Sequence, residues 1–216
     1  MTGRLPHMLR SDAQENRDRV LDAARSLFSE HGLDVPIREI ARRAGVGPAT
    51  LYRRFPTKQA LIDLAFAREV KQCREIVRNA WADEDPWRGM CSVVNGLAEI
   101  NAQNQGFVDA FMTASPDAID FAAHRADMLR MIAELCRRAK HAGALRPDFV
   151  LDDFILVLMV GRGLSAAPPD VRRTAARRFS ALTLDALRAS PTTATLPPPV
   201  RVTPAVLANW GGGRPI

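Results

Sequence analysis

Basic side chains gather in one short segment of this chain, between Arg38 and Lys58, and their types suit binding to phosphates. The segment contains a single acidic residue, Glu39. Its basic residues are Arg38, Arg42, Arg43, Arg53, Arg54 and Lys58. Guanidinium and ammonium groups that neutralise phosphates release counterions, and this release dominates affinity for nucleic acid. We therefore interpret the segment as a candidate surface for duplex DNA.

The charge of the whole chain favours the same kind of partner. The 216 residues carry 30 Lys and Arg against 24 Asp and Glu, a formal net charge of +6. Up to Ala60, 11 basic residues stand against 7 acidic ones, so this first part accounts for +4 of the total. An excess of positive charge on one part of a chain favours a polyanionic partner for that part.

Other reactive side chains do not form a recognisable catalytic or metal site. None of the histidines has the spacing of metal ligands or of a nucleophile and its base. They are His7, which we place in an N-terminal arm, His31, His124 and His141. Asp117 and Asp120 resemble a carboxylate pair, but they lie between two apolar helical stretches, where such side chains cap helices. We expect no catalytic residue, no metal and no cofactor.

The cysteines and the hydropathy of the chain indicate the cellular compartment in which the protein is found. Cys73, Cys91 and Cys136 are odd in number and widely spaced, so we expect buried, reduced thiols rather than disulfides. No stretch approaches the ~20 apolar residues that cross a bilayer, and residues 1–10 lack the apolar run of a secretory signal. We expect a cytoplasmic protein with no membrane partner.

Helical periodicity organises the N-terminal part. Apolar residues recur every three or four positions between Asp12 and His31, which predicts an amphipathic helix that Gly32 ends as a C-cap residue. Asp34 is the expected N-cap of a second helix, and Pro36 suits its first turn. The buried side of that helix is predicted to be Ile37, Ile40, Ala41 and Ala44.

A tight turn and a third short helix follow. Residues 45–47 form the turn, and the helix from Pro48 to about Arg54 points Leu51 and Phe55 inward. Thr57 is the expected cap of a long helix from Lys58 to about Ala82. Two short helices joined by a tight turn, with the second basic on its outer side, are what insertion into a major groove requires.

The rest of the chain shows helical periodicity only, without an alternating run long enough for a strand. We predict helices at about 87–104, 107–115, 117–142, 148–164 and 169–189. After Ser190 Pro, Thr and Gly dominate, which predicts an irregular tail in which Val206, Leu207 and Trp210 dock back as one short turn. The predicted fold is all-α, with a DNA-binding domain at 12–71, a helical domain at 72–190 and a Pro/Gly-rich tail at 191–216.

The motif at residues 37–61 is similar in order and spacing to the signature of the TetR family of bacterial transcriptional regulators. The matching segments are Ile37-Arg38-Glu39-Ile40-Ala41, Ala44-Gly45-Val46, Thr50-Leu51-Tyr52-Arg53-Arg54-Phe55 and Lys58-Gln59-Ala60-Leu61. The resemblance covers about Asp12 to Lys71 in detail. It implies a helix-turn-helix domain joined by a long helix to a helical domain for ligand binding and dimerisation.

Carried over residue by residue, the resemblance implies a DNA interface. Tyr52 and Lys58 would clamp phosphates. The residues at or near base edges and flanking phosphates would be Arg38, Pro48, Ala49, Thr50, Arg53 and Arg54. Gly47 stands where relatives often have a capping Ser or Thr, Ala49 where they often have Gly, and Arg54 where they often have His. The recognised bases therefore cannot be copied from relatives, and Arg42 and Arg43 remain either phosphate contacts or solvated charges.

The resemblance also implies an effector cavity and a dimer interface in the helical domain. We expect the cavity to be lined by Trp87, Phe107, Phe111, Met112, Phe121, Met128 and Met131, each of which would also fit an ordinary core. The family dimerises through its last two long helices. We assign Phe154, Leu158, Ala175, Phe179, Leu182 and Ala186 to that interface.

These observations predict a DNA-binding transcriptional regulator. It would be a homodimeric repressor of a pseudo-palindromic operator, released by a small, mostly apolar effector. Two other classes of protein are alternatives: an enzyme on a helical scaffold, which no nucleophile–base pair or phosphate loop supports, and a helical protein-interaction module with a basic surface. A steep salt dependence of binding to duplex DNA would distinguish the DNA-binding regulator from both alternatives.

Overall fold

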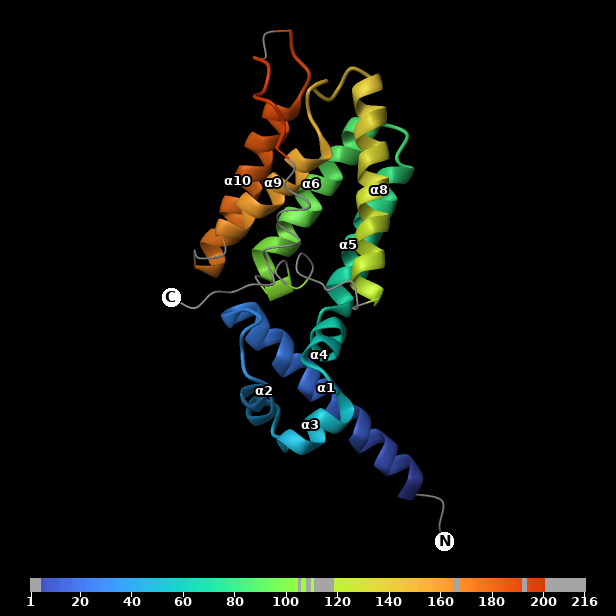
Figure 1. The fold of residues 1–216 in the computed structure, drawn as a ribbon, viewed down its shortest axis with the longest axis vertical. Helices are drawn as coiled ribbons and strands as arrows, with labels where there is room; N and C mark the ends of the chain where they lie inside the picture. The colour runs from blue at the N-terminus through green and yellow to red at the C-terminus, as the bar shows by residue number, and fades with distance from the viewer. Residues whose placement is uncertain are drawn as a thin grey trace.

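The computed structural model describes residues 5–104, 106–107, 110, 119–164, 168–191 and 194–200, without side chains at 5–13, 119–123, 162 and 169. Every regular element in these residues is a helix, which confirms the predicted all-α fold (Figure 1). The helices are α1 Leu5–His31, α2 Ile37–Ala44, α3 Pro48–Arg54, α4 Lys58–Ala65, α5 Ala67–Ala82, α6 Pro86–Gln103, α8 Ile119–His141, α9 Leu151–Gly163 and α10 Pro169–Leu187. None of these helices is both long and apolar enough to cross a bilayer.

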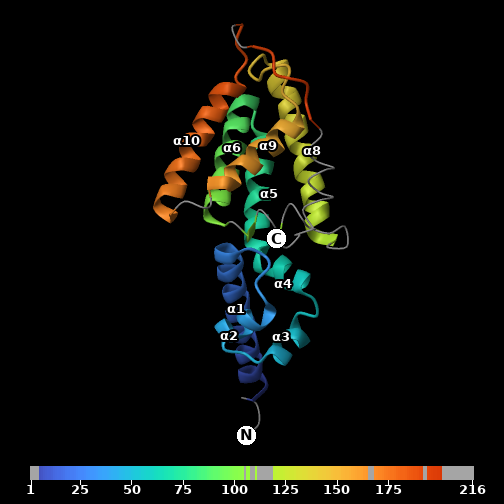
Figure 2. The same cartoon turned by 60° about the vertical axis from the view of Figure 1, so that its left-hand side comes forward.

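The helices form a small N-terminal unit and a larger bundle, one above the other in Figures 1 and 2. In the N-terminal unit, α1 packs against α2 and α4, and α2 packs against α3. In the bundle, α6 is central, because it contacts α5, α8, α9 and α10. The recognition helix expected from the sequence, α3, lies on the side of the N-terminal unit that faces away from the bundle (Figure 1).

Local backbone chemistry fixes the turn between α2 and α3. Gly45 adopts the left-handed conformation (φ 67°, ψ 32°) that side chains disfavour, and it ends α2. The Val46 amide then donates to the Ala41 carbonyl at 3.0 Å, which closes the turn. At the start of α4, the Thr57 side chain accepts a hydrogen bond from the Ala60 amide at 3.0 Å, so the predicted cap is confirmed.

Two predicted helix starts are wrong. The first helix begins at Leu5 rather than Asp12, which places His7 within α1 and not in an arm. Pro6 does not prevent this, because proline is tolerated in the first turn of a helix. The second helix has Pro36 itself as its N-cap, and Asp34 makes no capping hydrogen bond. The backbone of Pro36 already has the extended conformation that an N-cap needs (φ −65°, ψ 140°).

The predicted long helix from Lys58 to Ala82 is also wrong, because it is interrupted at Phe66. Phe66 leaves the helical region (φ −103°, ψ 10°) and separates α4 from α5. The Arg25 side chain on α1 donates a 3.0 Å hydrogen bond to the carbonyl of Ala65, the last residue of α4. A side chain that takes a carbonyl out of the helical ladder is a recognised cause of such a break.

The remaining predicted helices are confirmed to within three residues at either end. The largest difference is at α9, which starts at Leu151 rather than 148. The helix expected at 107–115 lies mostly outside the described residues, although Phe107 and Ala110 are helical. The expected docking turn at Val206, Leu207 and Trp210 lies outside them as well. The part of the tail that is described, 194–200, has no regular structure, as predicted.

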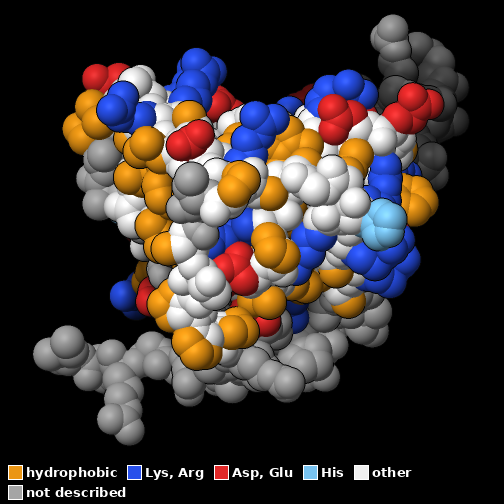
Figure 3. Space-filling model, turned by 90° about the horizontal axis from the view of Figure 1, so that it is seen from above, with side chains coloured by type: hydrophobic (Ala, Val, Ile, Leu, Met, Phe, Trp, Pro, Cys, Tyr) orange, Lys and Arg blue, Asp and Glu red, His pale blue; other side chains and the backbone are white. Residues whose placement is uncertain are grey.

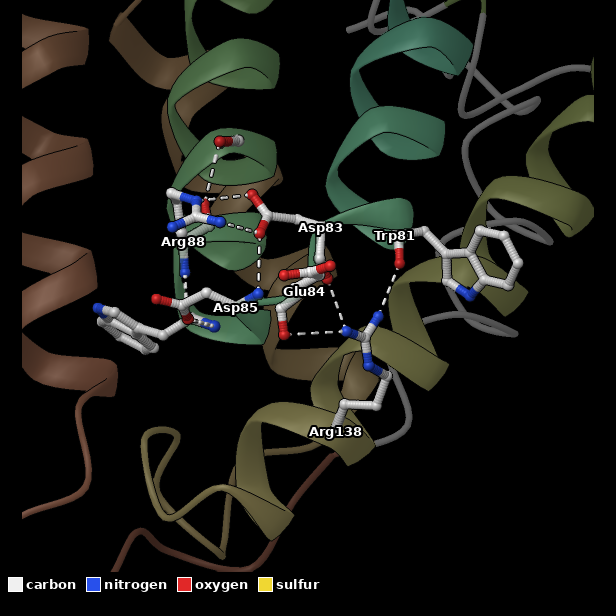
Figure 4. A network of polar contacts seen from close by, with 8 residues as sticks. Trp81, Asp83, Glu84, Asp85, Arg88 and Arg138 are labelled. Carbon is white, nitrogen blue, oxygen red and sulfur yellow. Dashed lines mark hydrogen bonds and ion pairs between the residues drawn. The ribbon is translucent and has the colours of Figure 1, made fainter.

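A polar network fixes the corner between α5 and α6 (Figure 4). Arg138 of α8 donates to the carbonyls of Trp81 and Asp83, both at 2.6 Å. Asp85 caps α6 by accepting from its first backbone amides, and Arg88 hydrogen-bonds the Asp83 carboxylate. These bonds satisfy the backbone groups that the two helix ends leave free, and they join α8 to the corner.

Three buried phenylalanines join the N-terminal unit to the bundle. The rings of Phe28 and Phe66 lie 6.2 Å apart, and those of Phe66 and Phe107 lie 5.7 Å apart. Next to them the Ser29 hydroxyl of α1 donates to the Asn104 side-chain oxygen at 3.0 Å. We name this set of contacts the aromatic junction. Gly106 approaches the Phe28 carbonyl so closely that a Cβ at residue 106 would overlap that oxygen.

The thiols are buried to different degrees. Cys73 and Cys136 are buried as expected, whereas Cys91 is only partly covered, so the expectation is wrong for that residue. Desolvation raises the pKa of Cys73 to about 12 and that of Cys136 to about 11. Both thiols therefore stay protonated at neutral pH.

Gly106→Ala should destabilise the protein by about 1–3 kcal/mol, because the new methyl group can only be accommodated by moving the backbone at the junction. Gly161→Ala in α9 is the matched control. A Cβ there meets nothing within 4 Å, and alanine is favoured over glycine in a helix by up to ~1 kcal/mol. Chemical denaturation of the two variants checks this, and equal stabilities would contradict the close approach at Gly106.

Candidate nucleic-acid interface

The predicted DNA-contacting residues lie on α2, on α3, in the turn between them and at the start of α4. Leu51 and Phe55 are each 1 % exposed and anchor α3 on the core, as predicted. The exposed members of the set are Arg38, Gly47, Pro48, Ala49, Thr50, Tyr52, Arg53 and Arg54, and Lys58 is half-buried at the start of α4. We name these nine residues the α3 surface.

The register of α3 assigns different directions to its side chains. Ala49 and Arg53 are four residues apart and share the face opposite the buried Leu51, so they point directly away from the core. Tyr52 and Arg54 leave the helix on the two flanks of that face. In a major groove, the central positions would meet base edges and the flanking positions would meet the phosphate walls. Tyr52 is 52 % exposed, so its ring is available for such a contact.

Gly47 substitutes for a capping side chain at the start of α3. It is the N-cap residue, has extended geometry (φ −69°, ψ 142°) and makes no side-chain cap. Its carbonyl accepts from the Thr50 and Leu51 amides at 3.0 and 3.1 Å. The helix therefore starts at Pro48 without a capping hydroxyl, and the small Gly47 and Ala49 leave the backbone accessible.

Ion pairing distinguishes Arg42 from Arg43. Arg42 donates two hydrogen bonds to Glu39, one of them from Nε at 3.0 Å. These hydrogen bonds hold the pKa of Glu39 below its usual value, so the carboxylate stays charged and offsets Arg42. Arg43 is exposed, and no ion pair involves it among the described residues. Of the two, Arg43 is therefore better placed to add positive charge beside the α3 surface.

The opposite end of the molecule, as far as the structure describes it, has no comparable concentration of one charge. Figure 3 views that end, where Lys and Arg side chains are interspersed with acidic and hydrophobic ones. Within the described residues, no group of three or more His, Cys, Asp or Glu side chains is arranged to hold a metal ion.

Two described members of the predicted effector cavity, Trp87 and Phe107, lie far apart, although Phe107, Met128 and Met131 all belong to the same hydrophobic core and Trp87 packs against it. Trp87 is in the first turn of α6 and Phe107 lies beyond its other end, and the 18 residues of α6 span ~27 Å. Trp87 is half-buried and stacks with Arg188, while Phe107 belongs to the aromatic junction. Met128 and Met131 are buried on α8. Phe111 and Met112 lie outside the described residues, and the side chain of Phe121 is not described.

The residues assigned to dimerisation divide between the core and the surface. Phe154 is 1 % exposed within the single chain and packs in its core. Leu158, Ala175 and Phe179 are half-buried, and Ala186 is exposed. Leu182 is 61 % exposed, and α9 and α10 also expose Leu156, Val160 and Val171. The sequence pattern missed Leu156 and Val160, because the continuously apolar run in α9 gives no sign of which side faces outward.

Both parts of the chain are similar to known proteins. Residues 20–65 match the family "Bacterial regulatory proteins, tetR family", and residues 85–189 match "Transcriptional regulator SbtR-like, C-terminal domain". The repressor KstR of Mycobacterium tuberculosis is 33% identical over 144 residues, which cover 65% of this chain and 66% of KstR. A regulator of Staphylococcus aureus is 38% identical over 63 residues, 29% of this chain and 34% of that protein. The chain thus spans less than two thirds of either relative.

Solved structures show the same fold. The regulator PfmR from Thermus thermophilus superposes with a TM-score of 0.62 at 21% identity, covering 77% of this chain and 97% of PfmR. KstR2 of Mycobacterium tuberculosis, described as a ketosteroid transcriptional regulator, superposes with a TM-score of 0.61 at 17% identity, covering 81% of this chain and 95% of KstR2.

The two short helices α2 and α3 and the tight turn between them form a helix-turn-helix. The chain belongs to the TetR family of bacterial transcriptional regulators.

Lys58→Ala should weaken binding to every duplex by a similar factor, because a contact to phosphate carries no sequence information. The slope of log affinity against log salt should become shallower by about 0.9, the value of one phosphate contact. Tyr52→Phe should also weaken binding uniformly, but without changing the slope, since it removes no charge. Salt titrations of both variants check this, and an unchanged slope for Lys58→Ala would contradict the assignment.

Arg53→Ala should instead relax sequence preference at one position of each half-site. An arginine that pairs with a guanine discriminates against other bases by ~1–3 kcal/mol. Binding to a library of single-base operator variants measures the effect. If Arg53→Ala lowers affinity for all variants equally, Arg53 contacts phosphate and the direction assigned to it from the register of α3 is wrong.

Proposed function

We propose that this regulator is a homodimeric repressor, which binds a pseudo-palindromic operator and is released when a small, mostly apolar molecule binds its helical bundle. The observation that carries the proposal is the α3 surface, where basic and small residues are exposed around a helix held from behind by Leu51 and Phe55. Repression is further supported by the similarity to KstR, which is a repressor. Binding to the chromosome would place the protein in the cytoplasm.

The exposed apolar side chains of α9 and α10 support dimerisation. Leu156 and Val160 are one helical turn apart on α9, and Val171 and Leu182 are exposed on α10 at 49 % and 61 %. Contiguous exposed apolar surface marks interaction sites. A two-fold axis at these helices would place two copies of α3 on the same side of the dimer. Such a dimer reads half-sites about one DNA turn, ~34–36 Å, apart.

Release by an effector requires that the ligand favour the dimer conformation that does not bind DNA. A ligand shifts an equilibrium only by its differential affinity for the two states, and coupling between distant sites is usually ~1–3 kcal/mol. Operator affinity should therefore fall by roughly 5–150-fold at saturation. Operator DNA must weaken effector binding by the same factor.

Selection of bound fragments from the source genome with the purified protein tests the proposal. We expect enriched fragments to share an inverted repeat, because a two-fold symmetric dimer imposes its symmetry on its site. Enrichment without a repeat would contradict the dimeric mode of binding. The absence of any salt-dependent affinity for duplex DNA would contradict the function altogether and favour a protein-interaction module.

Leu182→Asp should dissociate the dimer and abolish operator binding with it, because it places an unpaired charge in a desolvated interface. Val200→Asp is the control. Val200 is 68 % exposed but lies in the tail, so the same change there should leave the dimer intact. Sedimentation velocity of the two variants provides the measurement. If Leu182→Asp remains a dimer, the interface lies on another surface of the protein.

A further inference from the structure

The tail segment 194–200 is held on the bundle by its backbone. Every side chain of this segment is exposed. The Ala194 carbonyl accepts a hydrogen bond from Arg146 Nη2 at 2.7 Å, and the Leu196 amide donates to Asp148 Oδ2 at 2.8 Å. These are the hydrogen bonds that the segment makes with the described residues. Two side chains from the connection between α8 and α9 therefore hold the tail without any buried side chain of the tail itself.

Arg146 and Asp148 are joined to each other and to the end of α10, and we name this pair the Arg146–Asp148 fork. Arg146 donates from Nε to Asp148 Oδ1 at 2.6 Å and from Nη2 to Oδ2 at 3.0 Å. These bonds and the one from the Leu196 amide hold the pKa of Asp148 well below its usual range, so the carboxylate stays charged. Arg146 is 7 % exposed, and it also donates to the Ala186 carbonyl from Nη1 and to the Leu187 carbonyl from its backbone amide. Because these last contacts do not involve the tail, the fork stays in place when the tail leaves.

The fork offers the tail the same groups as a neighbouring β-strand. In an antiparallel pair of strands, the carbonyl of one residue and the amide of the second residue after it bond to the same partner strand. Ala194 and Leu196 have this spacing, and the fork supplies the matching donor and acceptor. The following residues, 197–199, are prolines without an N–H, so the pairing cannot continue along the tail. The fork thus recognises backbone atoms and not particular side chains.

The contact between the tail and the fork should open readily, because no buried apolar contact of the tail accompanies it. When the tail leaves, Arg146 and Asp148 each lose one partner at the surface of the bundle. A donor and an acceptor held in fixed geometry lose little freedom when they bind again. We propose that the Arg146–Asp148 fork is a binding site for the backbone of an extended peptide, and that the tail of the same chain occupies it reversibly.

Hydrogen exchange of the Leu196 amide, measured by NMR on the full-length protein labelled with ¹⁵N-leucine, tests the docked state. Exchange should be about ten- to hundredfold slower than for a free amide, the usual value of a hydrogen bond to a charged group. Asp148→Ala should remove this protection. Asp127→Ala is the control, because Asp127 belongs to an exposed ion pair with Arg130 on α8. A Leu196 amide that is unprotected in the wild type, or still protected in Asp148→Ala, would overturn the site.

A blocked peptide of residues 191–200 tests the fork as a binding site in the full-length chain. Leu196→Pro removes the amide that the fork binds, whereas Leu196→Ala keeps it and changes only an exposed side chain. The peptide should bind Leu196→Pro more tightly than it binds the wild type or Leu196→Ala, and NMR shifts of the Arg146 Nε–H signal report the binding. The factor should equal the protection of the Leu196 amide in the wild type, because both measure the ratio of docked to free tail.

The same peptide with proline in place of Leu196 is the negative control and should not bind. Since tethered segments act at millimolar effective concentrations, the free peptide is titrated to about 10 mM. Equal affinity for the three chains, or no binding to Leu196→Pro, would overturn the proposal.

Dilution identifies the chain that supplies the tail. A tail docked on its own chain gives a protection of the Leu196 amide that does not depend on protein concentration. Protection that falls on dilution would show that the tail of a second copy occupies the fork, and would overturn the assignment to the same chain.

Discussion

The aromatic junction is the contact on which the rest of the structure depends. Phe28 of α1, Phe66 at the break between α4 and α5, and Phe107 after α6 are buried against one another. The helix-turn-helix unit therefore has no separate core at this end, because Phe28 of α1 and Phe107 of the bundle both pack against Phe66. Aromatic pairs at these separations contribute ~0.5–1.5 kcal/mol each beyond the area they bury. The bundle and α1 are therefore joined by packed side chains.

The polar contacts beside the junction make its geometry specific. Arg25 donates to the Ala65 carbonyl at 3.0 Å and lies 3.5 Å from a carboxylate oxygen of Glu69. The other oxygen of Glu69 is buried without a hydrogen bond to the described residues. Loss of Arg25 would leave this carboxylate buried and unpaired, which is strongly destabilising. The guanidinium group thus holds together the break at Phe66 and the buried acid that follows it.

The parts of the fold that local chemistry determines could be predicted from the sequence. The turn at Gly45, the cap at Thr57 and the inward side of α3 each depend on residues within one or two helical turns. The break at Phe66 could not be predicted, because Arg25, which stabilises it, lies 40 residues from Ala65 in the chain. The same limit applies to the bundle. Aromatic and methionine residues mark apolar surface, but Arg146, which is one arginine among many in the sequence, is distinguished only by the partners that it acquires on folding.

The exposed positions of the α3 surface follow from the same local patterns. Which of them are directed at base edges and which at phosphates follows from the register of α3. The central claim is that two copies of this surface enter successive major grooves on one face of the DNA. Hydroxyl-radical footprinting of the selected operator tests this most directly. We expect two protected patches whose centres lie about one helical turn, ~10–10.5 base pairs, apart, related by the two-fold axis of the operator. A single patch, or uniform protection without a repeat, would contradict it.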